Sequence, residues 1–176
     1  DEPIMYPSID WRKYLLNKTS VQTQHNLNIS GGTKDIRYFI SLGFLYQNGL
    51  LKQFEGVGYD NNYKYKRYNY RANLDFNVTK TTTLKIGIGG IVGNRNEPMI
   101  NDATNSIWTL INQTTPFSSP GVIDGQLIVT PEERFDNKIN LGNSALPKCY
   151  GTGYSTAINN TMNLDLLLNQ KLDFIT

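Results

Sequence analysis

The sequence predicts an all-β protein built as an antiparallel meander of about five long strands, and three observations predict it. Apolar and polar residues alternate over five separate stretches of the chain. The 21 Asn and 16 Thr, against only 18% charged residues, favour turns and strands over helices. Short clusters of Gly, Asn and Thr separate several of the stretches. This combination argues against a helical bundle, a coiled coil or a parallel α/β enzyme.

A short helix and two strands are expected in the first 50 residues. Ser8 is the expected N-cap of a helix of at most two turns over 10–16. Alternation then predicts a strand over 25–31 and another over 36–47, joined by a compact Gly-rich turn. The second strand ends at an Asn-Gly pair, which is typical of tight turns.

The clearest pattern in the chain covers 66–79, where apolar and polar residues alternate strictly. One face of the expected strand carries the apolar residues Tyr68, Tyr70, Leu74, Phe76 and Val78. The other face carries the polar residues Asn69, Arg71, Asn73 and Asp75. Because side chains alternate across a strand, this strand is expected to have one apolar and one polar side.

Two further strands are expected over 84–95 and 160–174, separated by a long loop over 96–158. Within that loop only two short features stand out, a helical turn or two from Ser106 and a small hairpin about Asp124-Gly125. A connection of this length without regular structure is usually functional or mobile.

Short and long connections alternate along the chain. The turns at 31–35 and 79–83 are short, whereas the connections 48–65 and 96–158 are long. Outer-membrane barrels have short periplasmic turns and long external loops, so the short turns are expected on the periplasmic side. No stretch of about 18 apolar residues predicts a transmembrane helix.

Four segments resemble the start of the barrel in SusC/RagA-type TonB-dependent outer-membrane transporters. They are His25–Gly32, Arg37–Phe44, Gln47–Lys52 and Lys66–Asp75, and the preceding Asp10-Trp11 also fits. The resemblance implies a segment of a large transmembrane β-barrel of about 22 strands. It also implies the outer membrane of a Gram-negative bacterium and uptake of oligosaccharides or peptides. We therefore expect residues 1–176 to be a partial barrel segment, a fragment of a larger transporter whose plug domain is absent from this chain.

The resemblance also implies where side chains point and what they meet. Asn69, Arg71, Asn73 and Asp75 would face the lumen, and Tyr68, Tyr70, Leu74, Phe76 and Val78 would face lipid. The implied partners are a SusD-like surface lipoprotein, the TonB complex acting through the missing plug region, a glycan or peptide substrate, and outer-membrane lipid. The small net charge of +2 gives no nucleic-acid footprint.

No catalytic residue, cofactor site or metal site is expected, and the chain is not expected to be an enzyme. The glycines of 87–93 lack the spacing of a dinucleotide-binding loop, and no helical pattern follows them. His25 is the only histidine and Cys149 the only cysteine, which excludes multi-His and Cys-rich metal sites. Lys148 is expected to lower the pKa of the neighbouring Cys149.

Two other hypotheses stay open at this point. One is a soluble all-β carbohydrate-binding module that uses Trp11, Trp108 and loop tyrosines. The weaker one is an enzyme that uses acidic residues of the long loop, and Glu132, Glu133 and Asp136 form the acidic cluster on which it depends.

Overall fold

The computed structural model describes residues 7–100, 106–128 and 144–172. The chain divides into two compact units, each assembled from three stretches of sequence. The sheet unit comprises 22–47, 65–95 and 157–176, and the loop unit comprises 1–21, 48–64 and 96–156.

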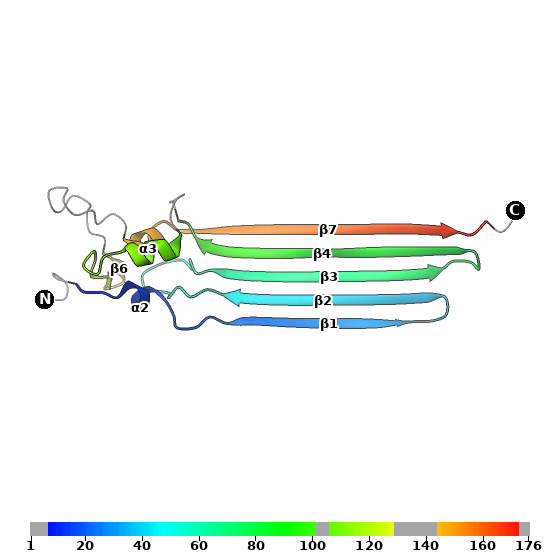
Figure 1. Ribbon diagram of the computed structural model, residues 1–176, viewed down its shortest axis with the longest axis horizontal. Helices are drawn as coiled ribbons and strands as arrows, with labels where there is room; N and C mark the ends of the chain where they lie inside the picture. The colour runs from blue at the N-terminus through cyan, green and yellow to red at the C-terminus, as the bar shows by residue number, and fades with distance from the viewer. Residues whose placement is uncertain (1–6, 101–105, 129–143, 173–176) are drawn as a thin grey trace. The chain divides into compact units, whose positions relative to one another are not determined.

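The sheet unit is one antiparallel sheet with the strand order β1-β2-β3-β4-β7, and consecutive strands point in opposite directions (Figure 1). Its strands are β1 (Gln22–Gly32), β2 (Ile36–Asn48), β3 (Lys64–Asn77), β4 (Thr82–Pro98) and β7 (Tyr154–Gln170). The antiparallel five-stranded sheet predicted from alternation is therefore confirmed. Strands that follow one another in chain order within this sheet also lie side by side, as in a meander.

The register between β1 and β2 shows how alternation separates the two faces. Leu27 lies opposite Leu42 and Ile29 lies opposite Ile40, so that apolar pairs share one face. Between them, Asn28 lies opposite Ser41 on the other face. A one-residue slip would exchange the two faces along the whole strand, so the sequence pattern specifies this register strongly.

Several strand bounds differ from the sequence expectation, and hydrogen bonds accompany the early ends of β3 and β7. β3 ends at Asn77, whose amide Nδ2 donates to the carbonyl of Lys34 at 3.1 Å, so Val78 lies beyond the strand. β7 covers Tyr154–Gln170 instead of 160–174, and the backbone N–H of Lys171 donates to the carbonyl of Thr81 at 2.8 Å just after its end. Phe174, expected at the end of this strand, lies outside the described residues.

The loop unit contains regular structure where the sequence predicted a loop. Its elements are α2 (Trp11–Leu15), α3 (Ile107–Gln113), the hairpin of β5 (Val122–Ile123) and β6 (Gln126–Leu127), and α4 (Ala145–Tyr150). The expectation of an irregular 96–158 is therefore wrong, because β4 extends to Pro98, β7 begins at Tyr154 and two helices lie between them. The helical turn expected from Ser106 is present as α3, whose N-cap is Ser106. The six-residue helix α4 was not expected, because it is too short for its periodicity to be recognised in a sequence.

Two local predictions in the loop unit can be compared with the structure. The hairpin turns at Asp124-Gly125, as expected, and both residues have positive φ angles of 49° and 74°. The N-cap of α2 is Asp10 and not Ser8, because the Asp10 carboxylate accepts from the backbone N–H of Lys13 at 3.2 Å.

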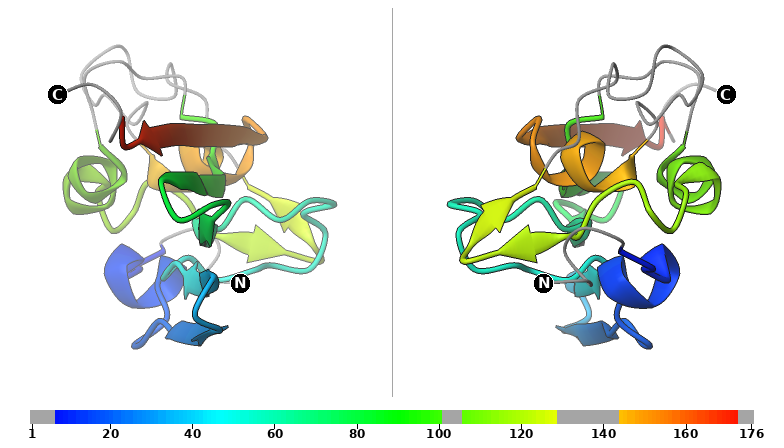
Figure 2. Two further views of the ribbon diagram at one scale, coloured as in Figure 1. Left: turned by 90° about the vertical axis from the view of Figure 1, so that its right-hand side faces the viewer. Right: turned by 90° about the vertical axis from the view of Figure 1, so that its left-hand side faces the viewer.

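The hydrophobic core of the described residues lies in the loop unit, and all three of its stretches contribute to it. The core residues are Trp11, Leu15, Leu51, Ile107, Leu110, Ile111, Ala145, Leu146, Cys149 and Tyr150. Figure 2 shows the short helices and the hairpin from two opposite directions. None of the helices in the described ranges combines the length and the apolar character that crossing a membrane requires.

Candidate functional site: the two faces of the sheet

One face of the sheet unit is apolar and exposed. Phe44 lies between His25 and Tyr68, with ring centroids 6.4 Å and 5.1 Å away, so the aromatic side chains of β1, β2 and β3 share this face. On the same face, Leu164 and Leu166 of β7 are 64% and 70% exposed. The sheet alone therefore leaves large apolar side chains in contact with its surroundings.

On this face, Gly90 of β4 leaves space for the side chain of Tyr70 on the neighbouring strand β3. A Cβ atom at Gly90 would lie 2.5 Å from the hydroxyl oxygen of Tyr70 and 2.5 Å from the carbonyl oxygen of Thr161. The ring of Tyr70 therefore lies over the bare backbone of β4. This explains one glycine of the 87–93 run without any nucleotide site.

The opposite face carries the polar residues predicted from the sequence. A Cβ atom at Gly87 would lie 3.4 Å from Cβ of Asp165 and 3.6 Å from Oδ1 of Asn73, so β3, β4 and β7 share this face. Arg71 and Asn73 are joined by a hydrogen bond of 3.4 Å from Nε to Oδ1. Asp75 lies 4.0 Å from a guanidinium nitrogen of Arg37 on β2.

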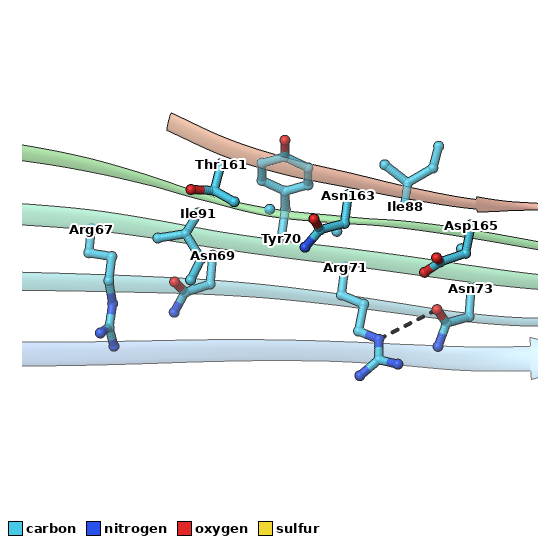
Figure 3. A pocket seen from close by; sticks show the side chains of 13 residues that line it. Arg67, Asn69, Tyr70, Arg71, Asn73, Ile88, Ile91, Thr161, Asn163 and Asp165 are labelled. Atoms are coloured by element: carbon cyan, nitrogen blue, oxygen red, sulfur yellow. Dashed lines mark hydrogen bonds between the residues drawn. The ribbon is translucent and has the colours of Figure 1, made fainter. Parts of the chain in front are cut away.

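Two shallow troughs lie along the polar face. The first has a volume of about 530 Å³, and Figure 3 shows the side chains that line it, with Arg67, Asn69, Arg71 and Asn73 in a row along β3. The second, of about 440 Å³, continues past Asn73 to Arg37, Asp75 and Lys85. We name the first one the polar trough.

Sequence reasoning missed part of this lining. Arg67 belongs to the same polar series of β3, two residues before Asn69, where the polar set expected from the sequence begins. Asn163 and Asp165 belong to β7, which lies far from β3 in sequence, and the polar half of its alternation is the signal that could have found them.

Four of the five residues predicted for the apolar face lie together on one side of β3. Tyr68, Tyr70, Leu74 and Phe76 alternate with the polar residues along β3 and so occupy its other side. Val78 does not belong to this strand and is 59% exposed in the turn that follows it.

Cys149 is not an activated nucleophile. It lies in α4 with no exposed surface, and burial raises the pKa of its thiol to about 12. The expectation that Lys148 lowers this pKa is therefore wrong, since the cause that sets the shift is desolvation of the thiolate.

The remaining candidate groups from the sequence are the acidic cluster of the long loop and the two tryptophans. Glu132, Glu133 and Asp136 lie outside the described residues. Within the ranges described, no three His, Cys, Asp or Glu side chains gather closely enough to hold a metal ion. Of the two tryptophans proposed for carbohydrate binding, Trp11 is only 3% exposed, whereas Trp108 is 45% exposed.

The loop unit is organised by polar residues that the sequence did not single out. Asn61 is fully buried and donates from its amide to the carbonyl of Cys149, while Asn62 accepts from the backbone N–H of Leu51 at 3.2 Å. Burial of the adjacent Asp60 raises its pKa, but the hydrogen bonds from Lys64 and from the backbone N–H of Asn62, together with the charge of Lys64, outweigh this, so the net pKa is lowered. These contacts hold the 48–64 stretch against α4.

Comparison with known proteins gives one informative similarity. No family model matches the chain. Over 125 residues the chain is 26% identical to "TonB-dependent receptor SusC" of Bacteroides thetaiotaomicron. The aligned part is 63% of this chain but only 12% of that protein, so the chain spans a small part of its relative's length. The two-faced sheet thus belongs to a chain that is similar, at low identity, to part of a TonB-dependent receptor.

Proposed function

We propose that this chain is a barrel-wall segment of a TonB-dependent outer-membrane importer of oligosaccharides or peptides and performs no catalysis. The similarity to a TonB-dependent receptor supports the transporter class. The observation that carries the proposal is the exposure of the apolar face, where Leu164, Leu166 and Leu168 are 64%, 70% and 65% exposed.

Lipid is the environment that suits such a face. Covering one large aliphatic side chain is worth about 1.5–3 kcal/mol, and soluble monomers rarely expose apolar patches larger than a few hundred Å². On the other face, charged residues such as Arg71 and Asp75 need water or polar partners. A barrel wall meets both requirements, since its outside is apolar and its interior polar.

The edges of the sheet support the same proposal. β1 and β7 are the edge strands of the described sheet, and β7 is 17 residues long. An exposed edge of that length leaves a row of backbone N–H and C=O groups without sheet partners. Further strands of a closed barrel would pair with both edges, as a membrane-spanning sheet requires.

In this proposal the protein sits in the outer membrane of a Gram-negative bacterium. The short connections 33–35 and 78–81 face the periplasm, and the longer connections 49–63 and 99–153 face outward. A SusD-like surface lipoprotein would act on the outer side. The TonB complex would act from the periplasm through a plug region of a longer protein.

The competing proposal is a soluble all-β carbohydrate-binding module. The exposure of Trp108, at 45%, favours it. The burial of Trp11 removes the second tryptophan on which it depended, because its indole N–H is committed to the carbonyl of Thr115 at 2.8 Å.

Spin labelling of the whole protein in lipid nanodiscs tests the proposal. A nitroxide is attached to the introduced cysteine of each of two variants, Leu74→Cys and Asn73→Cys. We expect the label at 74 to be relaxed mainly by oxygen, which partitions into lipid, and the label at 73 mainly by a water-soluble nickel chelate. The two positions are adjacent and on opposite faces, so each is the control for the other. Strong nickel relaxation at both positions would contradict the proposal and favour the soluble module.

A further inference from the structure

Two arginines of the polar trough have no acidic partner among the residues that the structure describes. Nε of Arg67 is buried without a hydrogen-bond partner there, and so is Oδ1 of the neighbouring Asn69. Arg71 donates only to the neutral amide oxygen of Asn73, at 3.4 Å. Arg37, in the adjacent trough, differs because it lies 4.0 Å from the carboxylate of Asp75.

The trough leaves space over the glycines of β4, beside these arginines. Gly87 and Gly89 of β4 form part of its lining, and a glycine raises no side chain above the sheet. The carboxylate in the lining is that of Asp165 on β7, which lies beside Gly87 and close to Asn73. Figure 3 shows Arg71 reaching toward Asn73 and not toward Asp165.

The charges of the polar face are unbalanced in one direction. The two troughs are lined by four cationic residues, Arg37, Arg67, Arg71 and Lys85, and by two anionic residues, Asp75 and Asp165. Arg67 is half-buried and Arg71 is exposed. A molecule that covers these guanidinium groups must offer them acceptors, since an unpaired buried charge is costly. A carboxylate matches the planar fork of donors on arginine better than a neutral acceptor does.

We propose that the polar trough binds a soluble, extended ligand that carries carboxylates, held by Arg67 and Arg71. The inference rests on the proposed function, because it requires the polar face to border an aqueous interior. Residues four apart on a strand are about 13 Å apart, so a ligand that meets both arginines carries at least two separated carboxylates. The amides of Asn69, Asn73 and Asn163 line the same trough and bind the polar groups between the carboxylates.

Binding of a matched pair of sugars to the whole protein in nanodiscs tests this inference by calorimetry. The probes are trigalacturonate, with three carboxylates, and its fully methyl-esterified form, in which the carboxylates are uncharged. We expect the acid to bind at least about tenfold more tightly than the ester, since a hydrogen bond to a charged group is worth more than a neutral one. A parallel measurement with triglutamate and triglutamine shows whether a peptide framework is accepted as well.

The variants Arg67→Gln and Arg71→Gln are each expected to weaken trigalacturonate binding at least about tenfold. The control is Lys66→Gln, which removes an exposed positive charge from the other side of the same strand and should leave binding unchanged. Arg67→Lys retains the charge without the fork and should bind with intermediate affinity. Unchanged migration of the folded barrel in a gel shows that each variant has folded.

Equal binding of acid and ester, or unchanged affinity in both arginine variants, would overturn the inference. Failure of the wild-type protein to bind either acidic probe would also overturn the inference, since it would show that an acidic segment of the protein itself fills the trough. The spin-label experiment at positions 73 and 74 reports on the proposed function separately. If position 73 is accessible to nickel while the arginine variants bind normally, the ligand assignment fails and the barrel proposal stands.

Discussion

The indole nitrogen of Trp11 donates a hydrogen bond of 2.8 Å to the backbone carbonyl of Thr115, and this bond joins positions 104 residues apart in the chain. Trp11 also packs edge-on against Tyr14, with ring centroids 5.6 Å apart. It begins α2, and Thr115 follows α3. One side chain therefore connects the first stretch of the loop unit to the last.

Replacement of Trp11 should loosen the loop unit. Trp11→Phe retains most of the ring but leaves the carbonyl of Thr115 without its donor, which should cost about 1–3 kcal/mol. Trp11→Ala should cost about 3–5 kcal/mol, because a cavity is added. Hydrogen exchange measures the effect at the amide of Lys52, which donates to the carbonyl of Leu15 at 2.8 Å. Trp108→Phe, at an exposed position, is the matched control and should leave this exchange unchanged.

The thiol of Cys149 should resist modification in the folded protein. At pH 8 a thiol with a pKa of about 12 is almost wholly protonated, and it is also fully buried. We expect maleimide to label Cys149 only after unfolding in guanidinium chloride, as mass spectrometry would show. Rapid labelling of the native protein at pH 8 would contradict the burial of α4.

The same group should make the stability of the loop unit fall at alkaline pH. The native pKa is raised to about 12 from an ordinary value of 9.0, so above about pH 9 the unfolded chain loses a proton that the folded chain keeps. The contribution of the Cys149 thiol to the free energy of unfolding is therefore fully present below about pH 9. Above that pH it declines by at most about 1.4 kcal/mol per pH unit. Denaturant unfolding at pH 8 and pH 10 measures the decline, and Cys149→Ala should reduce it. The pKa of Tyr150 is also raised by burial, so a smaller decline should persist in that variant.

Neighbouring positions on β3 should differ sharply in their tolerance of charge. In the proposed barrel, Leu74→Arg places a cation in lipid and should cost about 2–4 kcal/mol near the bilayer midplane. Asn73→Arg, on the polar face, should cost little. Equilibrium folding into lipid vesicles measures both. Equal costs at the two positions would show that the strand does not separate lipid from a polar interior.

Labelling on intact cells tests the proposed orientation. Gln113 is exposed at the end of α3, within the longest connection, and Lys34 lies in the short turn between β1 and β2. A cysteine in Gln113→Cys should react with a membrane-impermeant maleimide, whereas one in Lys34→Cys should react only after the outer membrane is permeabilised. Because Cys149 is buried, the native protein provides the blank. The reverse pattern would invert the orientation.

The sequence by itself determined the sheet and its two faces. In β3, strict alternation from Tyr68 to Phe76 was enough to predict both the strand and the side on which each residue lies. The reason is physical: the period of two is a property of the backbone and needs no knowledge of distant residues. The sequence also predicted the hairpin at Asp124-Gly125, because such a turn requires residues that readily adopt positive φ angles.

Only the tertiary structure decided how the segment between β4 and β7 packs. α3 and α4 are helices of seven and six residues, too short to be stable in isolation, and they exist because Trp11, Leu51 and Leu110 come together in one core. The same packing buries Cys149 and reverses the expected direction of its pKa shift. The polar trough likewise requires Asp165 of β7 to lie beside Asn73 of β3, across the glycines of β4. Contacts between residues so far apart in the chain depend on the fold as a whole, and no local pattern encodes them.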